Sequence, residues 1–236
     1  MLAELFVYAA SYRRTPPAFR RHLGEAVGLW ARGQRQTRAW APHLANSRGL
    51  IDTSIDDFGS RRTVVVLGSG PLFDLPVESL ARTFKRVILV DRIHLSTIGQ
   101  RVDRYANVER AWRDLSIARN PDALGFLEAI EDLDWVISLS LVSQLARGAP
   151  GAERQEVDGH LDKLAGLHCP ATLVTDLDYR VFNRHGVMLD NADLLHGRPV
   201  PRSGLRWKWE VAPFGEEGRH TRRVHSMAAW PDWRHA

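Results

Sequence analysis

The chain has 236 residues, 44% of them hydrophobic and 25% charged, and a formal net charge of +4. This composition is typical of a globular domain long enough to bury a core without disulfides. Its single cysteine, Cys169, excludes an internal disulfide, and one Cys beside His168 does not make a zinc site, so we expect no metal.

The first residues carry no basic segment ahead of an apolar run, which argues against a signal peptide. No stretch approaches the ~20 apolar residues of a membrane span. We therefore expect a cytoplasmic protein without a membrane partner. The arginine excess permits nucleic acid as a partner, although no motif indicates it and a GC-rich genome would also account for it.

Residues 1–60 are expected to form a helical N-terminal extension. Phe19, Leu23, Val27 and Trp30 recur at helical spacing within residues 17–46. A second helix is expected over residues 37–46, kinked by Pro42.

Residues 61–236 alternate between strand and helix patterns. Continuous β-branched runs predict strands buried on both faces of a parallel sheet. The predicted strands are 63–67, 86–90, 108–112, 135–139 and 171–175, and the predicted helices are 77–83, 121–131 and 153–167. This alternation indicates an α/β fold with a mostly parallel sheet and helices on both faces.

The chain closes with a different pattern. Residues 177–204 have few clean periodicities and are expected to be a long loop, which in a compact domain is usually functional or contains short helices. Residues 205–212 and 222–229 then resemble two strands of an antiparallel hairpin around a turn at 214–218.

A glycine loop follows the first predicted strand, in Leu67-Gly68-Ser69-Gly70-Pro71. Glycines here allow a sharp turn and let a ligand lie against the main chain, and the next helix adds N–H donors. This signal alone is weak, because glycines also occur in plain tight turns.

Two carboxylates end the next two predicted strands. Asp91 lies 23 residues after Gly68, where a carboxylate can accept from both hydroxyls of a ribose. Asp114 lies 23 residues further on and can accept from the exocyclic amine of an adenine, although it can equally be a helix N-cap.

This layout resembles the class I S-adenosylmethionine-dependent methyltransferases over roughly residues 60–230. The resemblance implies a Rossmann-like seven-stranded sheet whose last strand is antiparallel, and S-adenosyl-L-methionine as cofactor. The residues it assigns to the cofactor are Gly68, Ser69, Gly70, Pro71, Asp91, Arg92, Asp114, Leu115, Ser138, Leu139 and Ser140.

The chain departs from this family at three places. Val66 stands where the family often has an acidic residue, and Leu72 stands where its third glycine falls. Ser138-Leu139-Ser140-Leu141 replaces the Asn-Pro-Pro-Tyr signature of amino-group methylation, which argues against that mechanism.

The expected activity is methyl transfer to an unidentified small molecule. Ligands of open α/β sheets bind beyond the carboxyl ends of the strands, so Asp176, Asp178 and His185 are candidates for a catalytic base. Each also has a structural explanation, as a helix cap or a turn residue. The acceptor atom and the oligomeric state are not indicated.

Three alternatives share part of the evidence. An NAD-linked oxidoreductase would use the same strand, loop and Asp91, but Phe73 occupies the sixth place of GxGxxG. An enzyme of nicotianamine synthase-like type would use the aminopropyl arm of the same cofactor, and Gly68-Ser69-Gly70-Pro71-Leu72 resembles its loop. A non-catalytic protein that retains the fold is the third.

Overall fold

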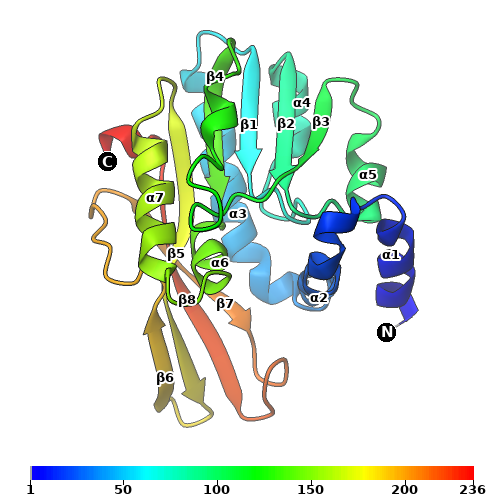
Figure 1. Ribbon diagram of the computed structural model, residues 1–236. Coiled ribbons are helices and arrows are strands. Elements are labelled where there is room, and N and C mark those ends of the chain that lie inside the picture. The colour runs from blue at the N-terminus through cyan, green and yellow to red at the C-terminus, as the bar shows by residue number, and fades with distance from the viewer. Residues whose placement is uncertain (1) are drawn as a thin grey trace.

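The computed structural model describes residues 2–236, so Met1, the first residue of the expected extension, lies outside the described residues. These residues form an eight-stranded sheet in the order β3-β2-β1-β4-β5-β8-β7, with β6 paired to β5 (Figure 1). The strands are β1 (Thr63–Leu67), β2 (Arg86–Asp91), β3 (Val108–Trp112), β4 (Leu133–Leu139), β5 (Ala171–Asn183), β6 (Met188–Asp193), β7 (Leu205–Ala212) and β8 (Thr221–Trp230). The α-helices are α1 (Leu2–Tyr12), α2 (Leu23–Arg35), α3 (Thr37–Ser54), α4 (Val77–Thr83), α5 (Ser96–Val102), α6 (Val142–Arg147) and α7 (Glu153–Ala165).

The pairing confirms the predicted α/β fold. β1 to β5 pair in parallel, and β8 runs antiparallel between β5 and β7. β1 matches its predicted bounds, and all five of its residues are buried, as in a central parallel strand. A mostly parallel sheet closed by an antiparallel hairpin is therefore the frame of the molecule.

The expected loop at 177–204 is wrong in its first half. β5 continues to Asn183 and pairs with β6, which makes an eighth strand. Five of the six residues of β6 are exposed, so no burial pattern marks it in the sequence. In Figure 1 this part of the sheet extends away from the helical layers.

Helices cover both faces of the sheet, as predicted. One core contains Val64 and Val66 of β1 together with Ile51 of α3 and Leu80 of α4. The other contains Val65 and Leu67 together with residues of α6 and α7, which lie in front of the strands in Figure 1. Alternate residues of β1 thus point into opposite cores.

Two helix predictions need correction. The N-terminal helical region breaks at Gln36, and α3 runs to Ser54 with Pro42 inside it, past the predicted end at 46. Residues 121–131 contain only a 3₁₀ turn at Gly125–Leu127, because i→i+3 bonds and the Asn120 side chain, which accepts from the backbone N–H of Asp122, replace the α-helical pattern.

No helix among residues 2–236 is both long enough and apolar enough to cross a membrane. The same residues contain no cluster of three or more His, Cys, Asp or Glu side chains arranged to hold a metal ion.

Candidate functional site

A cavity of about 560 Å³ opens at the carboxyl ends of the parallel strands. Residues at or after the ends of β1, β2, β3 and β4, together with Asp176 within β5 and His225 within β8, line one side of it. Residues of α2 and α3 in the N-terminal region line the other. Of the residues that the resemblance assigns to a cofactor, eight line this cavity: Gly68, Gly70, Pro71, Asp91, Arg92, Leu115, Leu139 and Ser140.

The glycine loop has the backbone that its sequence predicts. Gly68 and Gly70 have φ values of +76° and +50°, in the left-handed region that favours glycine. A Cβ on Gly68 would lie 3.0 Å from the carbonyl oxygen of Leu139, whereas a Cβ on Gly70 would meet nothing closer than 3.9 Å. Gly70 therefore leaves room for a ligand against the main chain.

Leu72, at the place of the expected third glycine, has a backbone conformation that favours glycine. Its φ is +61°, and its side chain is fully buried in the core below the loop. A left-handed conformation costs a non-glycine residue about 1–2 kcal/mol. The burial of the leucine side chain offsets that strain, so the loop retains its shape without the third glycine.

Asp91 closes the loop from the end of β2. Its Oδ2 accepts from the backbone N–H of Gly70 at 2.8 Å, and its Oδ1 accepts from the N–H of Ile93 at 3.2 Å. An ionised carboxylate offers about four acceptor sites, so two remain after these bonds. Asp91 can thus hold the loop and still bind a pair of hydroxyls in the cavity.

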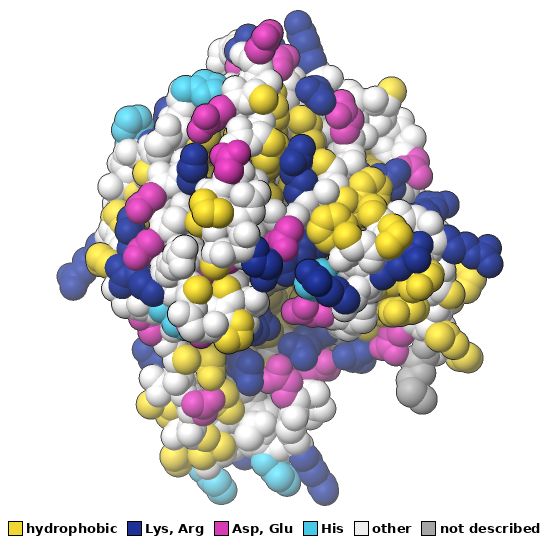
Figure 2. All heavy atoms as spheres, viewed as in Figure 1, with side chains coloured by type: hydrophobic (Ala, Val, Ile, Leu, Met, Phe, Trp, Pro, Cys, Tyr) yellow, Lys and Arg dark blue, Asp and Glu magenta, His cyan; other side chains and the backbone are white. Residues whose placement is uncertain are grey.

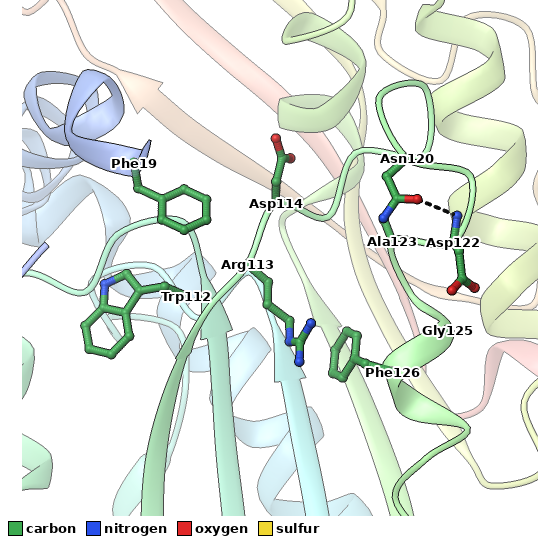
Figure 3. Close-up of a pocket in the computed structure, with 9 residues that line it drawn as sticks. All are labelled: Phe19, Trp112, Arg113, Asp114, Asn120, Asp122, Ala123, Gly125 and Phe126. Carbon is green, nitrogen blue, oxygen red and sulfur yellow. Dashed lines mark hydrogen bonds between the residues drawn. The ribbon is translucent and has the colours of Figure 1, made fainter. Parts of the chain in front are cut away.

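Asp114 lies in a neighbouring hollow rather than in the main cavity. Figure 3 shows this hollow between Phe19 and Phe126, with Arg113 directed at the ring of Phe126. The Asp114 carboxylate is bound by Arg92 at 3.1 Å and by Arg119 at 2.8 Å. Although burial would raise its pKa, Arg119 and Arg92 hold it below its ordinary value.

Asp114 caps no helix, because residues 115–120 form none; its Oδ1 instead accepts from the N–H of Ser116. Arg113 lines both hollows, which places Asp114 beside the cavity with its charge already paired.

Besides Asp114, two predicted cofactor residues do not line the cavity. Ser138 is buried within β4, where its hydroxyl contacts Nε2 of His160 on α7 at 2.8 Å. Ser69 is also fully buried, and its hydroxyl has no hydrogen-bond partner among the described residues.

A carboxylate–imidazole pair faces the same cavity from β5 and β8. Asp176 Oδ2 lies 2.9 Å from Nδ1 of His225, and both side chains are largely buried. Burial would raise the pKa of Asp176, but the hydrogen bond and charge of His225, with Ser143 beside them, keep it below its ordinary value. Asp176 is therefore ionised, and His225 must donate its Nδ1–H to it.

That donation determines the chemistry of the other ring nitrogen. When the ring is neutral, Nε2 of His225 holds the lone pair and can accept a proton. This atom is buried and has no hydrogen-bond partner within residues 2–236. The pair thus orients an unpartnered proton acceptor, in the arrangement that positions histidine bases in hydrolases.

A β-bulge positions Asp176. The register of β5 against β8 shifts between Asp176 and Asp178, and such bulges re-aim side chains near functional sites. Asp178 accepts from the hydroxyl of Ser226 at 2.7 Å and does not line the cavity. His185 lies in the exposed β5–β6 turn, where its N–H donates to Asn183. The cavity therefore brings in Asp176 but neither of the other two candidates.

Aromatic side chains of α3 and β7 lie beside the pair and form what we call the aromatic wall. His43 of α3 stacks on Trp209 with ring centroids 4.1 Å apart, and Trp207 donates its indole N–H to Nδ1 of His43 at 3.1 Å. Burial lowers the pKa of His43 to about 3, so this ring is a neutral part of the wall. Trp40 also lines the cavity and is anchored to the carbonyl of Val211.

Ion pairs join α2, on the open side of the cavity, to the β7–β8 loop. Arg35 binds Glu216 at 2.7 Å and Arg32 binds Glu217 at 3.0 Å, while Gln36 donates to Glu216. Hydrogen bonds from Arg35 and Gln36 hold the pKa of Glu216 below its ordinary value. These contacts, which we call the latch, connect the end of α2 to the β7–β8 loop.

No family model and no curated protein match the chain. Several solved structures are similar to it. The N-methyltransferase NodS from Bradyrhizobium japonicum, in complex with S-adenosyl-L-homocysteine, is 13% identical over 98% of each chain, with a TM-score of 0.41. DhpI in complex with SAH is 12% identical over 94% of this chain and 96% of that one, with a TM-score of 0.39. Precorrin-6y C5,15-methyltransferase from Geobacter metallireducens is 12% identical, over 76% and 85%, with a TM-score of 0.36.

Proposed function

We propose that the chain is an S-adenosylmethionine-dependent methyltransferase that acts on a small-molecule acceptor. The observation that carries the proposal is one cavity lined both by the glycine loop with Asp91 and by the Asp176–His225 pair. The glycine loop and Asp91 lie at the ends of β1 and β2, whereas Asp176 and His225 lie in β5 and β8, on the other side of β4 in the sheet. A cofactor-binding end and a proton-accepting end thus lie in one space.

The residues of the first end fit an adenosyl cofactor. Gly70 leaves space beside its main chain, and Asp91 has free acceptor capacity for ribose hydroxyls. Leu115 and Leu139 supply apolar surface for a base. Asp114 stays a prediction as the adenine-side acid, since its carboxylate is paired with arginines.

The cofactor would supply a methyl group on a sulfonium, from which the acceptor's lone pair takes the methyl carbon while the C–S bond breaks toward sulfur. Methyl transfer otherwise requires alignment and, for a protonated acceptor, removal of a proton. Nε2 of His225 takes that proton, and Asp176 stabilises the imidazolium that results. The aromatic wall and α2 limit the entry of water.

The substrate is expected to be a small molecule because α2 and α3 line the cavity on the side opposite the strand ends. On the face in Figure 2, basic and acidic side chains are interspersed rather than gathered into one basic field. A polyanion would be better served by a continuous positive surface. The cytoplasmic location stays a prediction.

A labelled-methyl transfer assay tests the proposal. The protein is incubated with methyl-labelled S-adenosylmethionine and a small-molecule extract, and both the labelled product and the nucleoside by-product are identified. We expect S-adenosylhomocysteine to form. Formation of 5′-methylthioadenosine would instead indicate transfer of the aminopropyl arm, and the absence of any turnover would favour a non-catalytic protein.

The base is tested with His225→Gln in the same assay. General-base catalysis contributes typically 10²–10⁴-fold, so we expect a loss of about that size while S-adenosylhomocysteine still binds. His235→Gln, a histidine whose side chain is 77% exposed in the C-terminal turn, is the matched control. Equal rates for wild type and His225→Gln would show that the acceptor needs no base at this position.

A further inference from the structure

The cavity contains a third carboxylate, Asp74, that the proposed reaction does not use. It lies between the glycine loop and α4, in a segment that holds no helix or strand. Its Oδ2 is 3.5 Å from the hydroxyl of Ser140, which is at the limit of a hydrogen bond. Within residues 2–236 no Lys, Arg or His forms an ion pair with it. Asp74 is thus an anion on the cavity wall without a paired cation.

The surroundings compensate this charge only in part. Burial raises the pKa of Asp74 to about 6, although its own backbone N–H, the charge of Arg48 on α3 and the Ser140 hydroxyl all act to lower it. A partly buried carboxylate is unfavourable unless a cation or several donors reach it. A ligand that brings a cation would therefore gain more here than at an exposed carboxylate.

Ser140 adds a second observation at the same place. This residue directly follows β4 and has a φ of +48°, a left-handed conformation that favours glycine. Such strain in a non-glycine residue persists only where the surroundings hold it, and it concentrates at binding sites. Here the strained turn brings the Ser140 hydroxyl to Asp74 on the cavity wall.

The order of the strands orients a ligand across this wall. Asp91 ends β2, the glycine loop follows β1, and Ser140 follows β4. The sheet order β2-β1-β4 therefore places Asp91 and Ser140 on opposite sides of the loop. With a ribose at Asp91, a cofactor that lay past Gly70 would bring its amino-acid arm to Ser140 and Asp74.

Val66 stands before the first glycine, where the resembled family often has an acidic residue. Its side chain is fully buried in the core on the α3 and α4 face of the sheet and does not line the cavity. The end of the cavity at Ser140 therefore lacks that carboxylate. We propose that Asp74 replaces it and binds the ammonium group of the cofactor's amino-acid arm, with Ser140 as an additional hydrogen-bonding partner. This inference rests on the proposed cofactor and assigns the residue that recognises its cationic end.

Paired ligands test the proposal by calorimetry. S-adenosylhomocysteine carries the ammonium, whereas 5′-methylthioadenosine has the same nucleoside and thioether without the arm. Charge-assisted hydrogen bonds are about twice as strong as neutral ones. We therefore expect Asp74→Asn to weaken S-adenosylhomocysteine about 10-fold or more and to leave 5′-methylthioadenosine unchanged.

Two comparisons make the result specific. Asp91→Asn is expected to weaken both ligands, because both carry the ribose. The deamino analogue of S-adenosylhomocysteine, which keeps the carboxylate and lacks the ammonium, should bind wild type and Asp74→Asn alike. Equal weakening of all three ligands by Asp74→Asn, or no weakening of S-adenosylhomocysteine, would overturn the assignment of Asp74 while leaving the cofactor in place. Failure of wild type to bind any of the three would overturn the proposed function and this assignment together.

Discussion

At the scale of single residues, the cavity depends on side chains that local sequence rules do not favour. Leu72 and Ser140 both have left-handed backbones, at the two loops that face each other across the end of β1 and β4. Each conformation is held by what surrounds it, a packed core for Leu72 and the cavity wall for Ser140. Replacing these residues by smaller ones shows how much stability comes from side-chain burial and how much is lost to backbone strain.

Leu72 provides the clearest stability prediction. Leu72→Ala should destabilise the protein by about 2–5 kcal/mol, since it removes a fully buried leucine from the core. Glycine normally gives a less stable folded state than alanine, but at a positive φ it relieves backbone strain. We expect Leu72→Gly to be no less stable than Leu72→Ala in urea unfolding; a clearly less stable glycine variant would contradict the left-handed conformation.

Asp74 makes stability depend on pH. Its pKa is raised to about 6 in the folded protein, so the folded state binds this proton more tightly than the unfolded chain does. The destabilisation is complete above pH ~6 and disappears as pH falls toward its unfolded pKa near 4. Asp74→Asn should therefore raise the unfolding midpoint at pH 8 and have little effect at pH 4.5. The same gain at both pH values would show that burial does not perturb Asp74.

Half of the candidate site was predictable from sequence. Gly68, Gly70 and Asp91 follow strands whose burial pattern is unmistakable, so their meeting at one sheet edge could be inferred. His225 could not be found this way, because it lies within an antiparallel strand and meets Asp176 only through the β5–β8 pairing, 49 residues away. The signal that could have found it is the strand-order rule, which places the closing hairpin beside β5.

At the scale of elements, strong burial patterns gave reliable predictions and exposed elements did not. β1 and α4 match their predicted bounds. The apolar residues of β1 face both cores, and those of α4 face one. β6 is exposed along most of its length, and the run at 121–131 has helical periodicity but is held in 3₁₀ turns by i→i+3 bonds. The structure of these two segments is determined by strand pairing and by local hydrogen bonds, rather than by the hydrophobic pattern.

The latch between α2 and the β7–β8 loop predicts a local effect. Glu216 has a side chain that is 7% exposed and is bound by Arg35 and Gln36, so Glu216→Gln should loosen α2 without unfolding the sheet. We expect faster hydrogen exchange confined to α2 and its neighbours. Glu109→Gln removes an exposed pair with Arg86 at the opposite end of the sheet and should leave α2 unchanged. Unchanged exchange in Glu216→Gln would show that the contacts of Glu216 are not needed to hold α2.

At the scale of the whole molecule, the strand order makes a single cavity from distant segments. The glycine loop, the β4 turn and the β5–β8 pair come from positions 68 to 225, and α2 and α3 close the space above them. This arrangement predicts a chain that holds an adenosyl cofactor at one end and acts on an acceptor at the other. The division into residues 1–60 and 61–236 stays a prediction.

Calorimetry with S-adenosylhomocysteine and NAD, on wild type and Asp91→Ala, tests the central claim most directly. We expect wild type to bind S-adenosylhomocysteine and not NAD. Asp91→Ala should weaken binding by about 1–3 kcal/mol, through the loss of charge-assisted hydrogen bonds. Tight binding of NAD without binding of S-adenosylhomocysteine would contradict the proposed function. So would the failure of wild type to bind either ligand.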